Sequence, residues 1–184
     1  VAKNIQIATK ALNMNVSEAA NLQTRFFSLA NTLGLSADQV SKDFATASKS
    51  LSALGNSGNA ATNAFAMLQA QIKATGLEMN TILSITDQFD KFDTGAQAVG
   101  KLNAILGGPF LSTIDMINNV DPSERLRMLA EALDDAGKNF DTMSYYERKA
   151  VADAAGLKDV NDLAMLMSGN LASLQAPQMD SQSI

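Results

Sequence analysis

Carboxylates are the side chains of this sequence that could carry out acid–base chemistry, because its 184 residues include no histidine and no cysteine. Glu78 and Asp87 lie nine positions apart, and two carboxylates can hydrolyse a glycosidic bond, one as the acid and the other as the base or nucleophile. Both residues fall on or beside one expected helix, and no β-hairpin is present to carry the second carboxylate. We therefore expect a helix cap and a solvated helix residue here, and a cell-wall hydrolase is the least favoured function.

Three aspartates spaced by three positions, Asp87, Asp90 and Asp93, raise the question of a calcium loop. An EF-hand loop needs oxygen ligands at its first, third and fifth positions. Phe92 occupies the third position counted from Asp90, so the pattern fails. We expect Asp93 and Thr94 to cap the next helix instead, because both side chains can accept hydrogen bonds from backbone amides at a helix start.

The absence of histidine and cysteine excludes several classes of site. Ser-His-Asp triads, histidine-based zinc sites, cysteine nucleophiles and disulfides each need one of these residues. Because the carboxylate patterns also fail, we predict no catalytic residue, no cofactor and no metal ligand. The chain is expected not to be an enzyme.

The charge balance limits the choice of partner. Fourteen basic and nineteen acidic residues give a net charge of −5, which disfavours specific nucleic-acid binding, because such affinity comes largely from Lys and Arg. The densest basic groups, Arg125 with Arg127 and Arg148 with Lys149, are expected on solvated helix faces. The longest uncharged stretch, residues 51–72, contains five amide side chains and is too polar to span a bilayer.

Apolar residues recur at helical spacing through most of the chain, as at Ala19, Leu22, Phe26, Leu29 and Leu33. Start and stop signals divide this pattern into short helices. The expected helices cover residues 19–33, 37–54, 60–75, 79–89, 96–106, 109–118, 122–136, 145–155 and 160–167.

Capping residues mark the expected helix starts. Ser17 and Ser36 precede two of them, Asp121 and Ser144 begin two more, and Pro109 is placed in the first turn of a helix that ends near residue 118. No segment alternates apolar and polar residues as a strand does. The fold class is therefore predicted to be all-α, a multi-helix array of short capped helices with no sheet.

A Gly-Leu step follows three of the helical runs, at residues 34–35, 76–77 and 156–157. Glycine adopts the left-handed conformation without steric cost, and the leucine after it can pack back on the helix. Residues 13–17, Asn-Met-Asn-Val-Ser, are expected to be a variant of this stop in which an asparagine takes the left-handed position. The spacing near 40 residues also suits a helical repeat, and hence a cytosolic α-helical adaptor or a repeat-type protein-binding module. The intervening sequences do not repeat, so ordinary helix ends are favoured.

These stops also suggest how the chain is divided. We predict an N-terminal helical part at residues 1–75, a C-terminal helical part at residues 76–168 and a flexible tail at residues 169–184, which is polar and contains one proline.

The apolar stretch at residues 102–120 surrounds the sequence Gly107-Gly108-Pro109. It is expected to form two buried helices joined by a tight turn, and the alternative is a hairpin that contacts a partner or a membrane. Phe89 and Phe92, just before this stretch, are expected to anchor the core. If the region does contact a partner, the candidate contact surface consists of Phe89, Phe92, Leu106, Pro109 and Phe110.

Five blocks of the second half resemble tail tape-measure proteins of tailed bacteriophages. In chain order they are residues 89–96, 101–108, 121–127, 144–150 and 152–157. Each block is a helix boundary, and the resemblance rests on their occurrence together in one order across residues 85–167. The N-terminal part, with its Gly-Leu-Ser helix starts and alanine-rich helices, is compatible with the same family.

The resemblance implies a virion structural protein, assembled in the host cytoplasm into the phage tail. Proteins of this family run along the tail lumen, set tail length during assembly and leave before the DNA. The implied partners are tail tube and baseplate hub proteins, with one end held in the tip, often as a trimer, and a membrane contact on ejection. The short capped helices lack sustained heptads. We therefore expect a compact region of a longer protein of this kind, and not its ruler portion.

Overall fold

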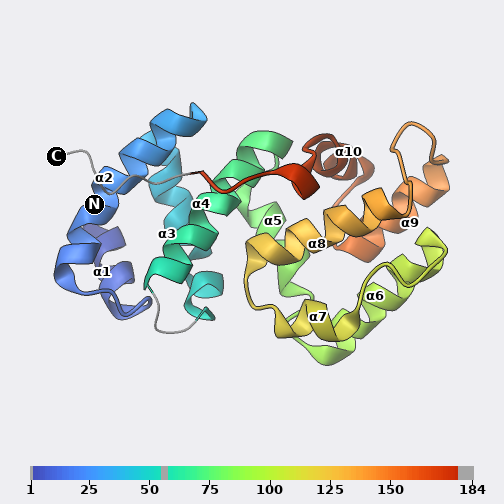
Figure 1. The fold of residues 1–184 in the computed structure, drawn as a ribbon, viewed down its shortest axis with the longest axis horizontal. Coiled ribbons are helices and arrows are strands. Elements are labelled where there is room, and N and C mark those ends of the chain that lie inside the picture. Colours follow the sequence, from blue (N-terminus) through green and yellow to red (C-terminus); the bar gives the residue numbers. More distant parts are fainter. Residues whose placement is uncertain (1, 55–57, 178–184) are drawn as a thin grey trace.

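The computed structural model describes residues 2–54 and 58–177, and in these residues it contains ten α-helices, one 3₁₀ helix and no strand (Figure 1). The predicted all-α fold class is confirmed. The helices are α1 (Ala2–Lys10), α2 (Val16–Leu33), α3 (Ala37–Ser52), α4 (Gly58–Thr75), α5 (Met79–Asp87), α6 (Phe92–Leu106), α7 (Thr113–Asn118), α8 (Pro122–Asp135), α9 (Tyr145–Ala155) and α10 (Val160–Ser168), followed by the 3₁₀ helix η1 (Leu171–Ser173).

The helices form two halves that meet along α3, α4 and α5 (Figure 1). Helices α1 to α3 lie in one half and α6 to α10 in the other. Helix α4 contacts α2 and α3 on one side and α8 and α10 on the other, while α3 also contacts α5. The predicted boundary between residues 75 and 76 coincides with the α4–α5 junction. One continuous cluster of buried apolar side chains crosses it.

The core of the first half is built around three phenylalanines. Phe26 of α2, Phe44 of α3 and Phe65 of α4 are almost fully buried, and their ring centroids lie 4.9–5.5 Å apart in tilted and edge-to-face arrangements. Such pairs add to the stabilisation from burial alone. Alanines at neighbouring positions let the helices approach closely, so few aromatic residues suffice to fill this core.

Several predicted helix ends are confirmed. Ser36 Oγ accepts a hydrogen bond from the Gln39 amide at 3.1 Å, and Asp121 Oδ1 accepts one from the Ser123 amide at 2.8 Å. Ser144 forms the full capping box that the sequence predicted. These bonds satisfy amides that have no partner inside the helix.

The predicted left-handed glycines are also confirmed: Gly34, Gly76 and Gly156 have φ angles of 64°, 76° and 77°. Of the two asparagines in the N-terminal variant, Asn13 is the left-handed one, with a φ of 50°, whereas Asn15 has a φ of −71°. At the first of these stops, the Leu35 amide donates to the Ala30 carbonyl oxygen at 2.8 Å, the bond that closes a Schellman motif. The helices therefore end where the Gly-Leu steps indicated.

Three predicted helix starts are wrong, those of α2, α6 and α7. Asn15, and not Ser17, caps α2, because the Asn15 side chain forms a capping box with Glu18. Helix α6 begins at Phe92, so Asp93 and Thr94 lie inside its first turn; the Thr94 hydroxyl donates to the Gln88 carbonyl oxygen at 2.6 Å.

Pro109 lies outside any helix, and α7 begins only at Thr113 after the cap Ser112. The Asn103 side chain explains the difference, because it donates to the Leu111 carbonyl oxygen at 2.8 Å and accepts from the Leu111 amide at 2.9 Å. This reciprocal pair holds the segment after Gly107 in an extended turn.

The start of the predicted flexible tail is packed against the rest of the molecule. Leu171 in η1 is 1% exposed and η1 contacts α8, so the packed chain continues past Ser168. The remainder of this predicted segment, residues 178–184, lies outside the described residues.

Candidate functional site

The two carboxylates considered for glycoside hydrolysis lie at opposite ends of α5. Glu78 is the N-cap residue and Asp87 is the last residue of the helix. Nine residues of α-helix span about 13 Å at the usual rise per residue. Glycosidase carboxylates are about 5–9.5 Å apart. The fold therefore keeps the pair apart along a rigid element.

Arg125 of α8 is the most connected polar side chain of the second half. It is 4% exposed, and its guanidinium donates to carbonyl oxygens at the ends of two other helices. Near the end of α5 these are Thr86 at 3.0 Å and Phe89 at 3.4 Å. Near the end of α7 they are Met116 at 2.9 Å and Ile117 at 3.5 Å. A positive charge is favourable at a helix C-terminus, where carbonyl oxygens lack partners.

Arg125 was predicted on a solvated helix face, and that prediction is wrong. Arg127, two residues on, is partly exposed and pairs with Glu124 and Glu131 on the surface of α8. The two side chains leave the helix in different directions, since residues two apart do not share a face. Because every nitrogen of the Arg125 guanidinium already donates to protein oxygens, this residue serves the fold and is not free to bind a ligand.

Asp87 and Asp90 lie beside this arginine. Arg125 Nη1 is 2.6 Å from Asp90 Oδ1, although the Asp90 side chain is 62% exposed. Burial, and then the charge of Asp90, raise the pKa of Asp87, while Lys49 and Ser50 act in the opposite direction. These residues line a cleft of about 290 Å³ between the ends of α3 and α5. The negative charges of Asp87 and Asp90 in this cleft are balanced by the positive charges of Lys49 and Arg125.

A second cleft, of about 410 Å³, lies between α3 and the α4–α5 junction. Asp43 on its wall is 5% exposed and accepts hydrogen bonds from two amides, Gln39 Nε2 at 2.8 Å and Gln69 Nε2 at 3.0 Å. Sequence reasoning missed Asp43. The signal was available, since Asp43 lies next to Phe44 and between Val40 and Ala47 on the buried side of α3.

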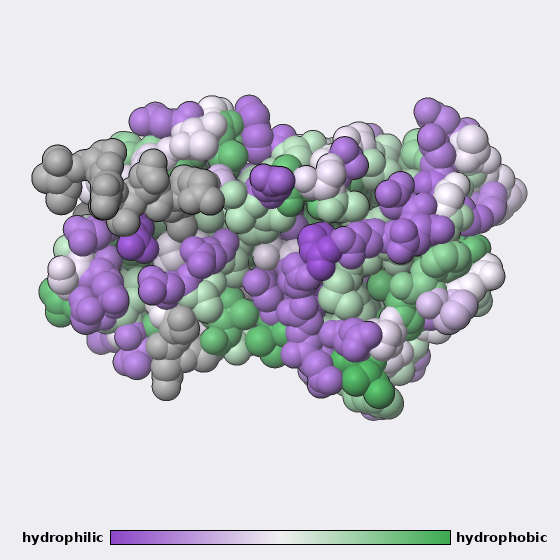
Figure 2. All heavy atoms as spheres, in the orientation of Figure 1, coloured by the Kyte–Doolittle hydropathy of each residue, from purple (hydrophilic) through white to green (hydrophobic). Residues whose placement is uncertain are grey.

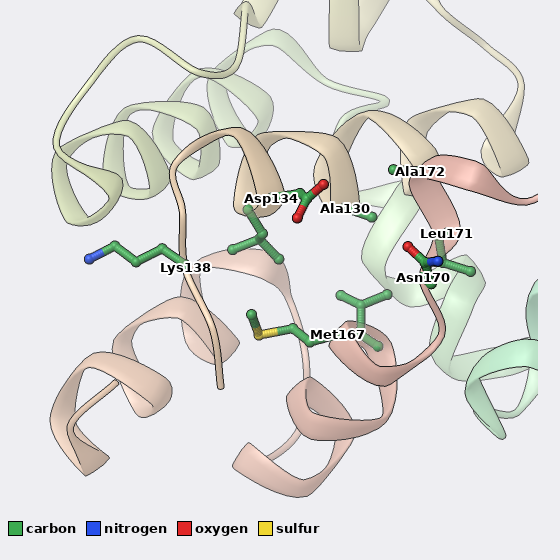
Figure 3. Close-up of a pocket in the computed structure, with 9 residues that line it drawn as sticks. Ala130, Asp134, Lys138, Met167, Asn170, Leu171 and Ala172 are labelled. Atoms are coloured by element: carbon green, nitrogen blue, oxygen red, sulfur yellow. The ribbon is translucent and has the colours of Figure 1, made fainter. Parts of the chain in front are cut away.

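A third cavity lies where α8, α10 and η1 meet (Figure 3). It has a volume of about 70 Å³, and its lining combines apolar residues such as Leu133, Leu166 and Leu171 with the polar residues Asp134 and Asn170. The amine of Lys138 points away from it in the close-up. Such a volume holds a few water molecules and no organic ligand.

The five residues of the predicted partner-contacting surface do not form one surface. Phe89 and Leu106 are buried, at 0% and 6% exposure, whereas Phe92 is 65% and Phe110 37% exposed, and Pro109 is also exposed. Phe89 therefore anchors the core as expected, but Phe92 does not.

Further exposed apolar side chains near α6 and α7 were missed by the sequence analysis. Ile114 is 64% and Val120 44% exposed. Figure 2 shows hydrophobic atoms gathered at the lower edge of the second half, where α6 and α7 lie in Figure 1. This part of the surface is one of the places where the fold leaves apolar side chains uncovered, and Val16 and Phe27 are others.

Two further observations concern membranes and metals. Among the residues described, no helix is both long and apolar enough to cross a membrane. Within the same residues, no three acidic side chains come together as metal ligands.

Buried polar side chains such as Arg125 chiefly join helices to one another. The solvent-exposed surface contains the two polar clefts and several exposed apolar side chains. Searches of protein-family models, of curated proteins and of solved structures each found no match to this chain.

Proposed function

We propose that this chain is a compact helical region of a phage tail tape-measure protein, a virion structural component that sets tail length and is held near the tail tip or baseplate hub before ejection. The observation that carries the proposal is the series of five blocks at residues 89–96, 101–108, 121–127, 144–150 and 152–157, which resemble that family in type and order.

The positions of these blocks in the fold support treating them as one unit. Residues 89–96 join α5 to α6, residues 101–108 end α6, and residues 121–127 begin α8. Asp90 of the first block pairs with Arg125 of the third at 2.6 Å. The blocks that carry the resemblance are thus also segments that hold the second half together.

The use of polar side chains supports a structural role. Gln88 Nε2 donates to the Ala155 carbonyl oxygen at the end of α9 at 2.8 Å, and Gln71 Nε2 donates to the Ser123 carbonyl oxygen at 2.7 Å. Arg125 does the same for two further helix ends. These side chains stabilise junctions between short helices, which suits a folded segment inside a longer scaffold protein.

The test is the composition of purified virions. We expect mass spectrometry of gradient-purified particles to detect peptides of this chain at a few copies per virion, far fewer than the tail tube protein. Antibodies against residues 58–177 should label one end of isolated tails in electron micrographs. A phage-encoded protein that is not part of the virion serves as the negative control.

Absence of these peptides from virions, with the protein present in the infected-cell lysate, would overturn the proposal. A stable monomer that copurifies with a host protein under the same conditions would favour the α-helical adaptor instead.

A further inference from the structure

The cleft between α3 and the α4–α5 junction has one negatively charged wall. Asp43 contributes a nearly buried carboxylate that, among the described residues, accepts hydrogen bonds from neutral amides alone. Glu78, at the N-cap of α5, makes no capping hydrogen bond with its side chain. Among the described residues, neither carboxylate has a cationic group within 4.0 Å. Helix α4 ends at this cleft and α5 begins there, so the opposite potentials of the two helix ends offset each other and the carboxylates determine the charge of the wall.

The cleft also has an apolar wall. Ile72, Leu77 and Met79 line it opposite the polar face of α3. A volume of about 410 Å³ is within the range of sites that hold small organic groups. A bare metal ion would leave most of this space and all of the apolar wall without a contact.

One cation of the chain itself lines the cleft, Lys42. Its Nζ atom is 2.8 Å from the Asp38 carboxylate, and both side chains are mostly exposed. Lys42 is therefore paired with Asp38 on the solvent side of α3 and, among the described residues, makes no ion pair with Asp43 or Glu78, although its charge at the cleft still repels a cation.

From this arrangement we infer that the cleft binds a basic side chain, foremost an arginine, from an extended segment of a partner protein. The guanidinium pairs with Asp43 and Glu78. The methylene stem lies along Leu77 and Met79, as the stems of long basic side chains commonly do on apolar surface. Arginine fits better than lysine, because its planar fork of donors can reach two carboxylates at once, and each Asp43 oxygen can accept a second hydrogen bond. The inference does not depend on the virion assignment.

The test uses the 184-residue chain and two small probes of nearly the same shape, N-acetylarginine amide and its neutral citrulline analogue. Backbone amide chemical shifts are followed by NMR during titration with each probe. The arginine probe is expected to shift amides of Gly76 to Asn80 and of α3 in a saturable manner. Citrulline is expected to leave them unchanged.

Substitutions at Asp43, Glu78 and Lys42 test whether these two carboxylates bind the arginine probe. Glu78→Gln changes an exposed side chain that makes no capping hydrogen bond, so the fold should be retained, and it should weaken arginine binding about two- to fivefold. Asp43→Asn should weaken binding about tenfold or more, because the ligand then loses a desolvated charge partner. Lys42→Ala should strengthen binding. The matched control is Asp153→Asn, which removes an exposed carboxylate on α9 and should leave binding unchanged.

Equal shifts with arginine and citrulline would overturn the inference, as would arginine shifts that Glu78→Gln leaves untouched. Weaker binding in Lys42→Ala would also contradict it, since the cleft would then behave as an anion site. The virion composition test is unaffected by any of these outcomes, so failure of one proposal is distinguishable from failure of the other.

Discussion

The side chain of Arg125 pairs with Asp90 at 2.6 Å while the same guanidinium holds the carbonyl ends of α5 and α7. The Arg125 side chain is almost fully buried and the Asp90 side chain is mostly exposed. The two residues therefore contribute unequally to the stability of the fold. The carbonyl contacts lie in the interior, where lost hydrogen bonds are costly.

Replacement of the arginine should therefore be far more damaging than replacement of the aspartate. We expect Arg125→Met to lower the free energy of unfolding by roughly 3 kcal/mol or more, because several carbonyl oxygens lose their donors. Asp90→Asn should cost about 1 kcal/mol or less, as for other exposed ion pairs. Urea unfolding followed by circular dichroism measures both. Equal losses in the two variants would show that the ion pair, and not the carbonyl contacts, dominates.

Asp87 should make stability depend on pH in a defined direction. Its pKa is raised in the folded chain, chiefly by burial, so the ionised carboxylate destabilises the fold at neutral pH and this penalty disappears in acid. Asp87→Asn should stabilise the protein at pH 7, and the gain should vanish as the pH falls below the ordinary aspartate pKa.

Glu124 provides the opposite case for the same measurement. Its hydrogen bond with Arg127 lowers its pKa, so its contribution to stability is present above the ordinary glutamate pKa and is lost as the pH falls through the lowered value. Glu124→Gln should therefore destabilise at pH 7 and lose its effect in strong acid. Urea unfolding of Asp87→Asn and Glu124→Gln at pH 7 and pH 3 measures both effects. If the two variants changed the free energy of unfolding in the same direction at pH 7, this account would be contradicted.

Replacement by alanine should change the free energy of unfolding in opposite directions at Gly156, which ends α9, and at Gly100, which lies within α6. Gly156 has a φ of 77°, and an added Cβ would lie 3.3 Å from the Gln88 side chain, so Gly156→Ala should destabilise by about 1 kcal/mol or more. Gly100 lies within α6 and has open space around it. Gly100→Ala should stabilise by about 0.5–1 kcal/mol. Thermal unfolding of the pair tests whether backbone conformation sets the sign.

The phenylalanine cluster predicts a large contrast between buried and exposed rings. Phe44→Ala should cost about 3–5 kcal/mol, because it leaves a cavity between Phe26 and Phe65. Phe27, one residue along from Phe26, is 52% exposed, and Phe27→Ala should change stability by about 0.5 kcal/mol or less. A small effect at Phe44 would mean that this core is loosely packed in solution.

If the chain belongs to a phage tail, the apolar surface near α6 and α7 is the place to look for assembly defects. Phe92→Ser should leave the free energy of unfolding within about 0.5 kcal/mol of the native value, since the ring is 65% exposed, yet reduce incorporation into tails. Phe27→Ser is the matched control in the other half. Western blots of purified virions report the incorporation, and equal amounts in both variants would exclude this surface.

Local signals in the sequence predicted the glycine-ended helix C-termini and several helix starts, although three other starts were wrong. Caps such as Ser36 and Asp121 act through bonds to amides two or three residues away, and glycine stops such as Gly156 act through one backbone angle. Residues a few positions apart determine these features, so they are visible without a fold.

Burial of polar and aromatic residues was predicted poorly. Arg125 is buried where α5 and α7 end beside it, and Phe92 is the exposed first residue of α6, which begins one turn earlier than expected. The partners of Asp43 include Gln69, 26 positions away. Such contacts depend on how helices meet, which no short pattern specifies.

The position of α4 has a consequence for the order in which the chain can fold. Its ten buried residues are covered by α2 and α3 on one side and by α8 and α10 on the other. The side of α4 that packs on α2 and α3 can be buried once residue 75 has been synthesised. The side that packs on α8 and α10 can be buried only after synthesis has reached residue 168. During that interval a growing chain exposes the uncovered side of α4, and contacts such as Gln71 with Ser123 must close a loop of 52 residues. The N-terminal half is thus the part that can form first, and α4 is the template on which the rest is completed.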